Sequence, residues 1–316
     1  MAQRSACVVW RFSDGKPGHE AQSQGLINAL AQRRQLQVHE LSVNDYRRGL
    51  LDLVQKRFAC GAALPSPALL IGAGHATHWP LLAARRARGG RIIVLMKPSL
   101  PRSWFDLCII PQHDGVPAGN KVFITQGPLN TLNTLRTKAR TAGSAADTRR
   151  GLFLIGGPSS HYAWSEPDML QQIQQIVRTT PSVHWLLTTS RRTPATFLAA
   201  LQANPVSNLE LIPHSATAPG WVARQLAQVA QVWVSEDSMS MIFEALTAGA
   251  GVGLLQVPAK RLSRITRYSA SLIAATYVTA FAAWQPGSLL PAPAQPFNEA
   301  QRCARWLDEQ WLGPHG

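Results

Sequence analysis

Short apolar runs alternate with longer amphipathic stretches along most of the chain. The apolar runs have the length and flanking turn residues of buried strands, and the amphipathic stretches have helical spacing. Strands joined in this way by helices form parallel sheets through right-handed crossovers. The pattern predicts strands at 6–12, 36–41, 68–72, 92–96, 107–110, 122–125, 152–156, 183–188, 209–212, 232–235 and 252–257. It predicts helices at 19–33, 45–59, 78–88, 129–140, 166–178, 194–202, 220–230 and 238–248.

One segment, 141–148, interrupts this alternation with small and polar residues, as a linker between domains does. The chain on each side of it begins with a strand and a glycine-rich turn. We therefore expect an α/β protein with two Rossmann-like domains, 1–145 and 146–316, whose parallel sheets face each other across a cleft. The amphipathic run 297–311 is compatible with a final helix that packs back on the first domain.

The most informative segment is 235–245, where four polar residues, Ser235, Glu236, Asp237 and Ser238, join a predicted strand to a predicted helix. In open α/β sheets, ligands bind at such strand ends, and a helix start favours phosphate. The alternative is a well-capped helix with Asp237 or Ser238 at its N-cap. This segment alone leaves the two interpretations equally open.

The formal net charge of +14 narrows the range of partners. Arginine, which suits bidentate phosphate recognition, accounts for 25 of the 31 basic residues. The charge is scattered, and the chain has no zinc-finger spacing and no aromatic RNA-binding box, so we do not expect nucleic acid as a partner. Phosphorylated substrates or an anionic membrane surface fit better.

Other features indicate the compartment. No apolar stretch is long enough to span a bilayer, and the first residues lack the apolar region of a signal peptide. The four cysteines lie far apart and read as reduced thiols. We expect a cytoplasmic protein that is compatible with peripheral attachment to the inner membrane. The sequence leaves its oligomeric state open.

The second half places hydroxyls, glycines and arginines after neighbouring predicted strands. This combination at one sheet edge suits a diphosphate. Glu244, within a largely apolar helix, would accept hydrogen bonds from ribose hydroxyls, although it also reads as a surface residue of that helix. The predicted nucleotide-binding residues are Gly157, Ser159, Ser190, Arg191, Arg192, Thr193, Glu236, Asp237, Ser238, Ser240, Met241 and Glu244.

The first half carries a glycine-rich loop, 13–22, that is neither a Walker A loop nor a GxGxxG turn. Asp14 and His19 follow a strand, where either could act as a general base. The alternatives are an aspartate that forms a turn and an exposed histidine. The pair His75 and His78 has no carboxylate or cysteine beside it, so we predict no metal site.

Several motifs together resemble the mitochondrial-fission "elongated mitochondria" family, which has many bacterial members. They occur in order over most of the chain, from about residue 8 to 253. The motifs are SDGKPGHExQ at 13–22, FDL with PxHD at 105–114, TxGPL at 125–129, GGPS at 156–159, SRRTP at 190–194 and DSxSMxxEA at 237–245.

That family is similar to nucleotide-sugar glycosyltransferases of the GT-B type. The resemblance implies a donor site in the second domain, an acceptor site in the first, and no metal, because no Asp-x-Asp motif occurs. It implies no tightly bound cofactor, with a nucleotide-diphosphate sugar, UDP-linked, and a hydroxyl acceptor as substrates. The expected acceptor contacts are Gly15, Lys16, Gly18, Gln22, His75, Lys97, His113 and Asp114.

Two other functions remain open. One is a non-catalytic scaffold of the same fold that binds membrane or protein partners. The other is a nucleotide-sugar epimerase, which also uses two such domains. A transferase releases the nucleotide only with an acceptor, whereas an epimerase interconverts sugars without one.

Overall fold

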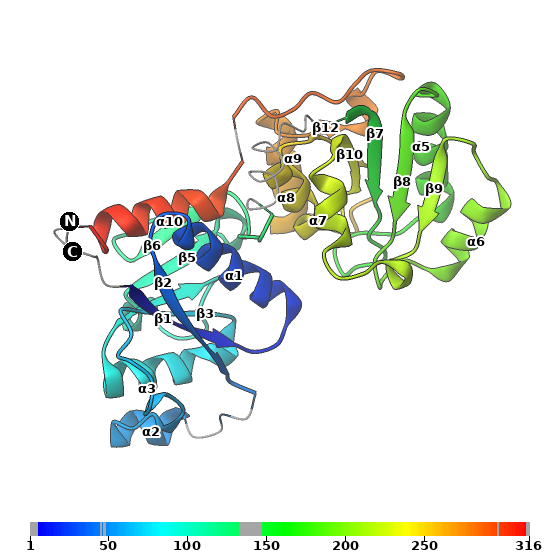
Figure 1. Ribbon diagram of the computed structural model, residues 1–316. Coiled ribbons are helices and arrows are strands. Elements are labelled where there is room, and N and C mark those ends of the chain that lie inside the picture. The colour runs from blue at the N-terminus through cyan, green and yellow to red at the C-terminus, as the bar shows by residue number, and fades with distance from the viewer. Residues whose placement is uncertain (1–5, 45, 47–48, 133–146, 296, 314–316) are drawn as a thin grey trace. The chain divides into compact units, whose positions relative to one another are not determined.

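The computed structural model describes residues 6–44, 46, 49–132, 147–295 and 297–313. It divides into two compact units, Met1–Asn133 with Asn298–Gly316, and Thr134–Phe297 (Figure 1). The C-terminal segment therefore belongs to the first unit. The helix expected at 129–140 and the linker expected at 141–148 fall largely on 133–146, outside the described residues.

A six-stranded parallel sheet forms the centre of the first unit. Its middle strands read as continuous apolar runs because both of their faces are covered. The strand order is β2-β1-β3-β4-β5-β6. The bounds are β1 (Cys7–Ser13), β2 (Leu36–Ser42), β3 (Leu69–Ala73), β4 (Arg91–Leu95), β5 (Leu107–Pro111) and β6 (Val122–Thr125).

Helices α1 (Pro17–Ala31) and α10 (Glu299–Gln310) lie side by side on one face of this sheet, and α2 (Gly49–Gln55) and α3 (His78–Arg88) belong to the other (Figure 1). The apolar face of α10, with Cys303 and Leu307, completes the core over α1. Asp308 on α10 pairs with Arg33 and Arg34 just after α1. These contacts explain why the end of the chain joins the first unit.

The second unit repeats the plan with another six-stranded parallel sheet, in the order β12-β11-β10-β7-β8-β9. Helices α5 (Glu166–Thr179) and α6 (Ala195–Ala203) contribute to the core on one face. Helix α8 (Met239–Ala248) packs on β10 and β11, and α7 (Trp221–Leu226) contacts β10. The strands are β7 (Asp147–Leu154), β8 (His184–Thr188), β9 (Leu209–Ile212), β10 (Val229–Ser235), β11 (Gly251–Leu255) and β12 (Thr279–Ala280).

Some predicted bounds were wrong. The helix expected at 220–230 ends at Leu226, because the chain from Val229 onward pairs with β7. Among the described residues of the helix expected at 45–59, only Gly49–Gln55 are α-helical. The strand β12 and the helix α9 (Arg264–Ala274) were not predicted. A signal for α9 existed, since Ser263 and Thr266 form a capping box at its start.

The strand orders determine where each sheet can bind a ligand. In the first sheet, the order reverses direction between β1 and β3; in the second, it reverses between β7 and β10. At such a switch point the two following loops leave on opposite sides of the sheet and open a crevice at the carboxyl ends of the strands. The loops after β1 and β3, and those after β7 and β10, are thus where sites are expected.

Candidate functional site

In the second unit, the loops after β7 and β10 are held together by buried hydrogen bonds. The backbone N–H of Gly156 donates to Oγ of Ser235 at 2.8 Å, and that of Gly157 donates to Oδ2 of Asp237 at 2.9 Å. Neither glycine has room for a side chain. A Cβ on Gly156 would lie 2.1 Å from the Asp237 carboxylate, and one on Gly157 would lie 2.3 Å from the Arg192 carbonyl oxygen.

Hydrogen bonds of the Arg192 side chain join the loop after β8 to the loops after β7 and β10. Its Nη2 lies 2.8 Å from Oδ2 of Asp237, and its Nη1 donates to the carbonyl oxygens of Gly157 at 2.8 Å and Pro158 at 3.1 Å. The Asp237 side chain is completely buried, and its other oxygen, Oδ1, has no hydrogen-bond partner in the described part of the chain. Both terminal nitrogens of Arg192 therefore already bond to other residues of the protein.

Ser190 and Thr193 also bind the β7 loop. Oγ of Ser190 donates to the Gly156 carbonyl oxygen at 2.9 Å, and the hydroxyl of Thr193 donates to the same oxygen. Neither side chain caps the helix expected at 194–202. Pro194 occupies the N-cap position of that helix, α6, which begins at Ala195, and no side chain caps it. The hydroxyls are already bonded to the loop they support.

Helix α8 begins directly after the Asp237 turn. Ser238, one of the two N-cap candidates of the alternative interpretation, occupies that position, but its side chain makes no capping hydrogen bond. The first N–H groups of a helix have no partner within the helix. Ser240 in this turn is exposed, and Met241 is partly exposed. The Ser238 side chain therefore does not cap the N–H groups at the start of α8, which follow the Asp237 turn.

Glu244 lies one turn further along α8. It is half-buried, and burial raises the pKa of its carboxyl group to about 7. No hydrogen bond or ion pair joins it to another described residue. Burial also raises the pKa of Glu236, whose Oε2 accepts from the Val257 N–H at 3.4 Å beside a cavity of about 400 Å³. Both acids follow β10 in the chain, and raised pKa values of this kind are typical of functional sites.

Two more predicted residues, Arg191 and Ser159, differ in whether their side chains already have hydrogen-bond partners. Arg191 is exposed and has no hydrogen-bond or ion-pair partner within the described residues. Ser159 is engaged, since its Oγ accepts from the N–H groups of His161 and Tyr162. Sequence reasoning missed Lys260, which donates to the Ser159 carbonyl oxygen at 2.8 Å. Its place just after β11 was a usable signal, because that strand ends at the same sheet edge.

In the first unit, the structure joins the two predicted catalytic residues. Nδ1 of His19 lies 2.8 Å from Oδ2 of Asp14, whose side chain is only 3% exposed. The Lys16 N–H donates to the other carboxylate oxygen at 3.2 Å. A carboxylate held in this way selects the orientation of the imidazole, as in catalytic triads, and leaves Nε2 for a substrate. Sequence reasoning had treated the two as separate candidates.

Gly74, after β3, makes room for this pair. A Cβ there would lie 2.4 Å from Cε1 and Nδ1 of His19, and the φ of +82° also favours glycine. The loops after β1 and β3 thus meet at the first switch point.

Arg11 on β1 is a buried residue that the sequence analysis did not single out. Its guanidinium bonds Ser23 at 3.0 Å, Glu40 at 2.5 Å and Glu20. Glu20 follows His19, and the Ser23 hydroxyl donates to the His19 carbonyl oxygen at 3.2 Å. Arg11 therefore anchors the turn of α1 that carries His19.

The predicted acceptor contacts follow four strands of the first sheet, at its carboxyl edge. Gly15, Lys16 and Gly18 follow β1 and are exposed, whereas Gln22 is buried in α1. The other four follow β3, β4 and β5: His75 and Lys97 are exposed, and His113 and Asp114 are partly buried. Burial, opposed by Asp114, lowers the pKa of His113.

Within the described residues, no helix is both long and apolar enough to cross a bilayer. Among them there is also no group of three or more histidine, cysteine and acidic side chains placed to hold a metal ion.

Comparisons with known proteins identify relatives in sequence and in fold. A family model described as "Mitochondrial fission ELM1" matches residues 17–311. This match confirms the resemblance drawn from the motifs. No curated protein matches the chain in sequence.

Solved structures share the fold at low identity. A putative UDP-N-acetylglucosamine 2-epimerase from Listeria monocytogenes is 11% identical with a TM-score of 0.63, covering 98% of this chain and 97% of that one. The UDP-GlcNAc 2-epimerase from Methanocaldococcus jannaschii is 10% identical at 0.55, covering 96% and 100%. The glycotransferase of kitacinnamycin is 15% identical at 0.51, covering 97% and 100%. The prediction of a GT-B-like fold with two parallel sheets is confirmed.

Proposed function

Because the chain belongs to the mitochondrial fission ELM1 family and has a GT-B-like fold, we propose that it is a metal-independent glycosyltransferase using a nucleotide-diphosphate sugar. The observation that carries the proposal is the construction of the β7–β10 switch point. There, backbone N–H groups, hydroxyls and the ion pair of Arg192 with the buried Asp237 hold the loops together, and Arg191 and Glu244 have no hydrogen-bond or ion-pair partner among the described residues.

In this proposal, the second unit binds the donor. Arg191 and the start of α8 meet the charge of the diphosphate, which grows on the leaving group during transfer. Glu244 accepts hydrogen bonds from the ribose hydroxyls, and the buried Oδ1 of Asp237 is a second free acceptor. Arg192 acts indirectly, because Asp237 and two carbonyl oxygens already hold it in place. The fold relatives titled as UDP-GlcNAc 2-epimerases favour UDP as the nucleotide.

The first unit receives the acceptor. His19, oriented by Asp14, removes the proton from the attacking hydroxyl through Nε2. Lys16, His75 and Lys97 are exposed at the same sheet edge and are suited to an acceptor that carries negative charge. The remaining predicted contacts, Gly15, Gly18, Gln22, His113 and Asp114, stay assigned to this side.

We extend the proposal to an acceptor that is an envelope or lipid-linked sugar at the cytoplasmic surface of an anionic membrane. Helix α2 exposes Leu51 and Val54, by 50% and 69%, immediately before the exposed Lys56 and Arg57. Apolar side chains next to cations are typical of surfaces that rest on anionic lipid. Vesicles with and without anionic lipid test this part separately, by co-sedimentation of the full chain at two salt concentrations.

The decisive experiment incubates the protein with UDP-GlcNAc and follows UDP release and the sugar by NMR. A transferase releases UDP only when an acceptor is added. The fold similarity to the two epimerases makes epimerisation the second candidate, and it would interconvert the sugar without an acceptor. If no nucleotide diphosphate raises the melting temperature, the protein is a non-catalytic scaffold and the proposal fails.

A further inference from the structure

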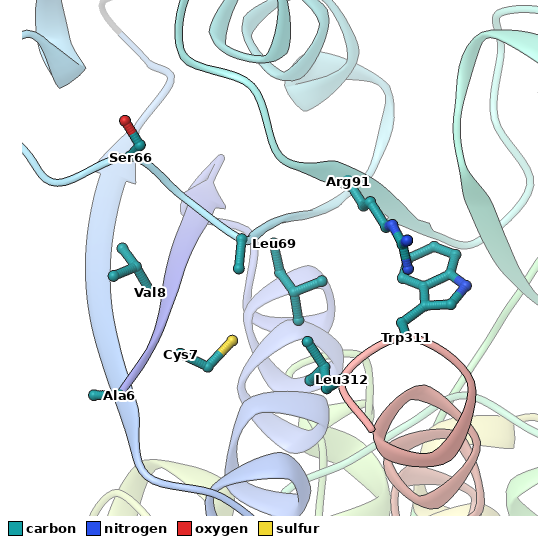
Figure 2. A pocket seen from close by; sticks show the side chains of 9 residues that line it. Ala6, Cys7, Val8, Ser66, Leu69, Arg91, Trp311 and Leu312 are labelled. Atoms are coloured by element: carbon teal, nitrogen blue, oxygen red, sulfur yellow. The ribbon is translucent and has the colours of Figure 1, made fainter. Parts of the chain in front are cut away.

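The first unit has a cavity at the edge of its sheet opposite the Asp14–His19 pair. It has a volume of about 490 Å³ and opens where β1, β3 and β4 begin, whereas the Asp14–His19 pair lies where strands end. Figure 2 shows Cys7 and Val8 on one side of the space, Leu69 and Leu312 at its centre, and Arg91 with Trp311 on the other. A cavity of this size is in the range of small-molecule sites.

The side chains that line the cavity are mostly apolar, and the polar ones are Ser66 and the cation Arg91. Side chains of Val8, Leu69, Leu312 and the Cys7 thiol offer apolar surface, and none of the lining residues is acidic. The Arg91 guanidinium carbon lies 5.1 Å from the centroid of the Trp311 ring. The indole covers one face of the guanidinium by a cation–π contact but leaves its N–H edge available.

The positive charge of Arg91 is not neutralised by any carboxylate among the described residues. Arg91 is exposed, and among the described residues no acceptor or carboxylate bonds its guanidinium. Arg34, whose charge acts on the Cys7 thiol, shares the single carboxylate of Asp308 with Arg33, so this ionic group also has an excess positive charge. A charge of one sign beside an apolar wall favours ligands that have an anionic head and an apolar body.

We propose that this cavity binds an anionic amphiphile, with a carboxylate or phosphate head on Arg91 and an apolar chain against Val8, Leu69 and Leu312. The site is independent of the proposed transferase chemistry. Its occupant would tie the start of the sheet to Trp311 and Leu312, the residues that follow α10.

Cys7 provides a built-in probe, because its half-buried thiol lines the cavity. The full chain is alkylated with N-ethylmaleimide at alkaline pH, where the thiolate forms, and the labelled cysteines are resolved by peptide mass spectrometry. Cys60 is exposed and outside the cavity, so it serves as the internal control. Octanoate is compared with octanol, which lacks the charge, and with acetate, which lacks the chain.

We expect octanoate to slow the labelling of Cys7 but not of Cys60, at a concentration at least about tenfold below that required for octanol. Acetate has no effect. Decanoate binds more tightly than octanoate, by up to about fourfold for each added methylene that is buried. Arg91→Ala weakens protection by octanoate about tenfold or more. Arg86→Ala removes an exposed arginine from α3 that does not line the cavity, and stays within about twofold of wild type.

Two sources of such a ligand are separated by vesicles. Protection of Cys7 by phosphatidylglycerol vesicles, but not by phosphatidylcholine vesicles, assigns the head and chain to bilayer lipid. Protection by monomeric octanoate alone assigns them to a free amphiphile.

Four results would each overturn the proposal: equal protection by octanol and octanoate, equal loss in both arginine variants, parallel slowing at Cys60, or a Cys7 that resists labelling without ligand. A melting curve of each variant verifies that the fold is intact before labelling is compared.

Discussion

Arg192 and Asp237 lie 45 positions apart in the sequence, yet Nη2 of the arginine is 2.8 Å from Oδ2 of the aspartate. The aspartate side chain is completely buried, and the arginine side chain is 42% exposed. The same aspartate oxygen accepts from the Gly157 N–H. One carboxylate thus joins the loops after β7, β8 and β10, and the ion pair serves first to build the proposed donor site.

Arg192→Ala should therefore act mainly on stability. It leaves the buried Asp237 carboxylate without its cation, and we expect the free energy of unfolding to fall by about 2 kcal/mol. Urea denaturation measures this change. Arg191→Ala removes the same side chain from the neighbouring exposed position and should stay within about 0.5 kcal/mol of wild type. Equal losses in the two variants would contradict the distinction between them.

Arg191→Ala should instead act on the donor. Loss of a charge-assisted contact to the diphosphate is expected to weaken UDP binding about tenfold, as measured by isothermal titration calorimetry. The matched control is Arg178→Ala, at the exposed last turn of α5 and far along that helix from the strand ends. An Arg191 variant that binds UDP like wild type would remove Arg191 from the donor site.

His19→Ala should abolish most of the turnover while sparing the donor. General-base catalysis contributes about 10²- to 10⁴-fold, so kcat should fall within that range, and Asp14→Asn should fall with it because His19 loses its orienting carboxylate. UDP binding should change less than twofold. His184→Ala is the control, because His184 is half-exposed at the start of β8. Full turnover in both site variants would refute the base assignment.

Glu244→Gln should change how stability depends on pH. The folded pKa of about 7 lies above the ordinary value of 4.5, so wild type loses stability as pH rises from 4.5 to 7 and the buried carboxyl group ionises. Glutamine has no such penalty. The variant should match wild type near the bottom of this range and exceed it by up to about 3 kcal/mol above its top.

The pH dependence of wild-type stability also contains a contribution from His78, so the Glu244→Gln variant must be compared with wild type. Burial, with the charge of His75, lowers the pKa of His78 to about 4, so its neutral form loses stabilising effect as pH falls from 6.5 to 4. This slope opposes that of Glu244 in the same range. Only the difference between Glu244→Gln and wild type, from urea titrations at each pH, isolates Glu244. A difference that does not vary with pH would contradict the raised pKa.

Gly157→Ala should destabilise the second unit. Its Cβ would lie 2.3 Å from the backbone oxygen of Arg192, which cannot swing away as a flexible side chain would. We expect a loss of about 1–3 kcal/mol in urea denaturation and weaker UDP binding. Gly119→Ala is the control, because no atom lies within 4 Å of the added carbon and its φ is not positive. A Gly157 variant as stable as this control would mean that the loops are less closely joined.

Local patterns were enough for much of the architecture. Alternating strands and helices identified two parallel sheets, and the helix at His78–Arg88 was predicted with the observed bounds. Most of the predicted site residues lie in the loops at strand ends, because polar residues that follow a buried apolar run must leave the sheet there, and the others lie in α1 and α8. These inferences succeed because apolar periodicity and turn residues act over a few neighbouring positions and are legible in the sequence.

The contacts between the site loops could not be predicted from the sequence, because they depend on which strands are neighbours in the sheet. Strand order brings Gly156 and Gly157 to Ser235 and Asp237. Only then is Arg192 held by the protein, while Arg191 has no partner in the part of the chain that the structure describes.

The pairing of His19 with Asp14 depends in addition on the space left by Gly74, which comes from another strand. The sequence by itself thus determined the fold class, the family and the strand ends at which most of the proposed site residues lie. The tertiary structure decided which side chains at those ends can bind a ligand, because the others are already hydrogen-bonded or packed against distant segments of the chain.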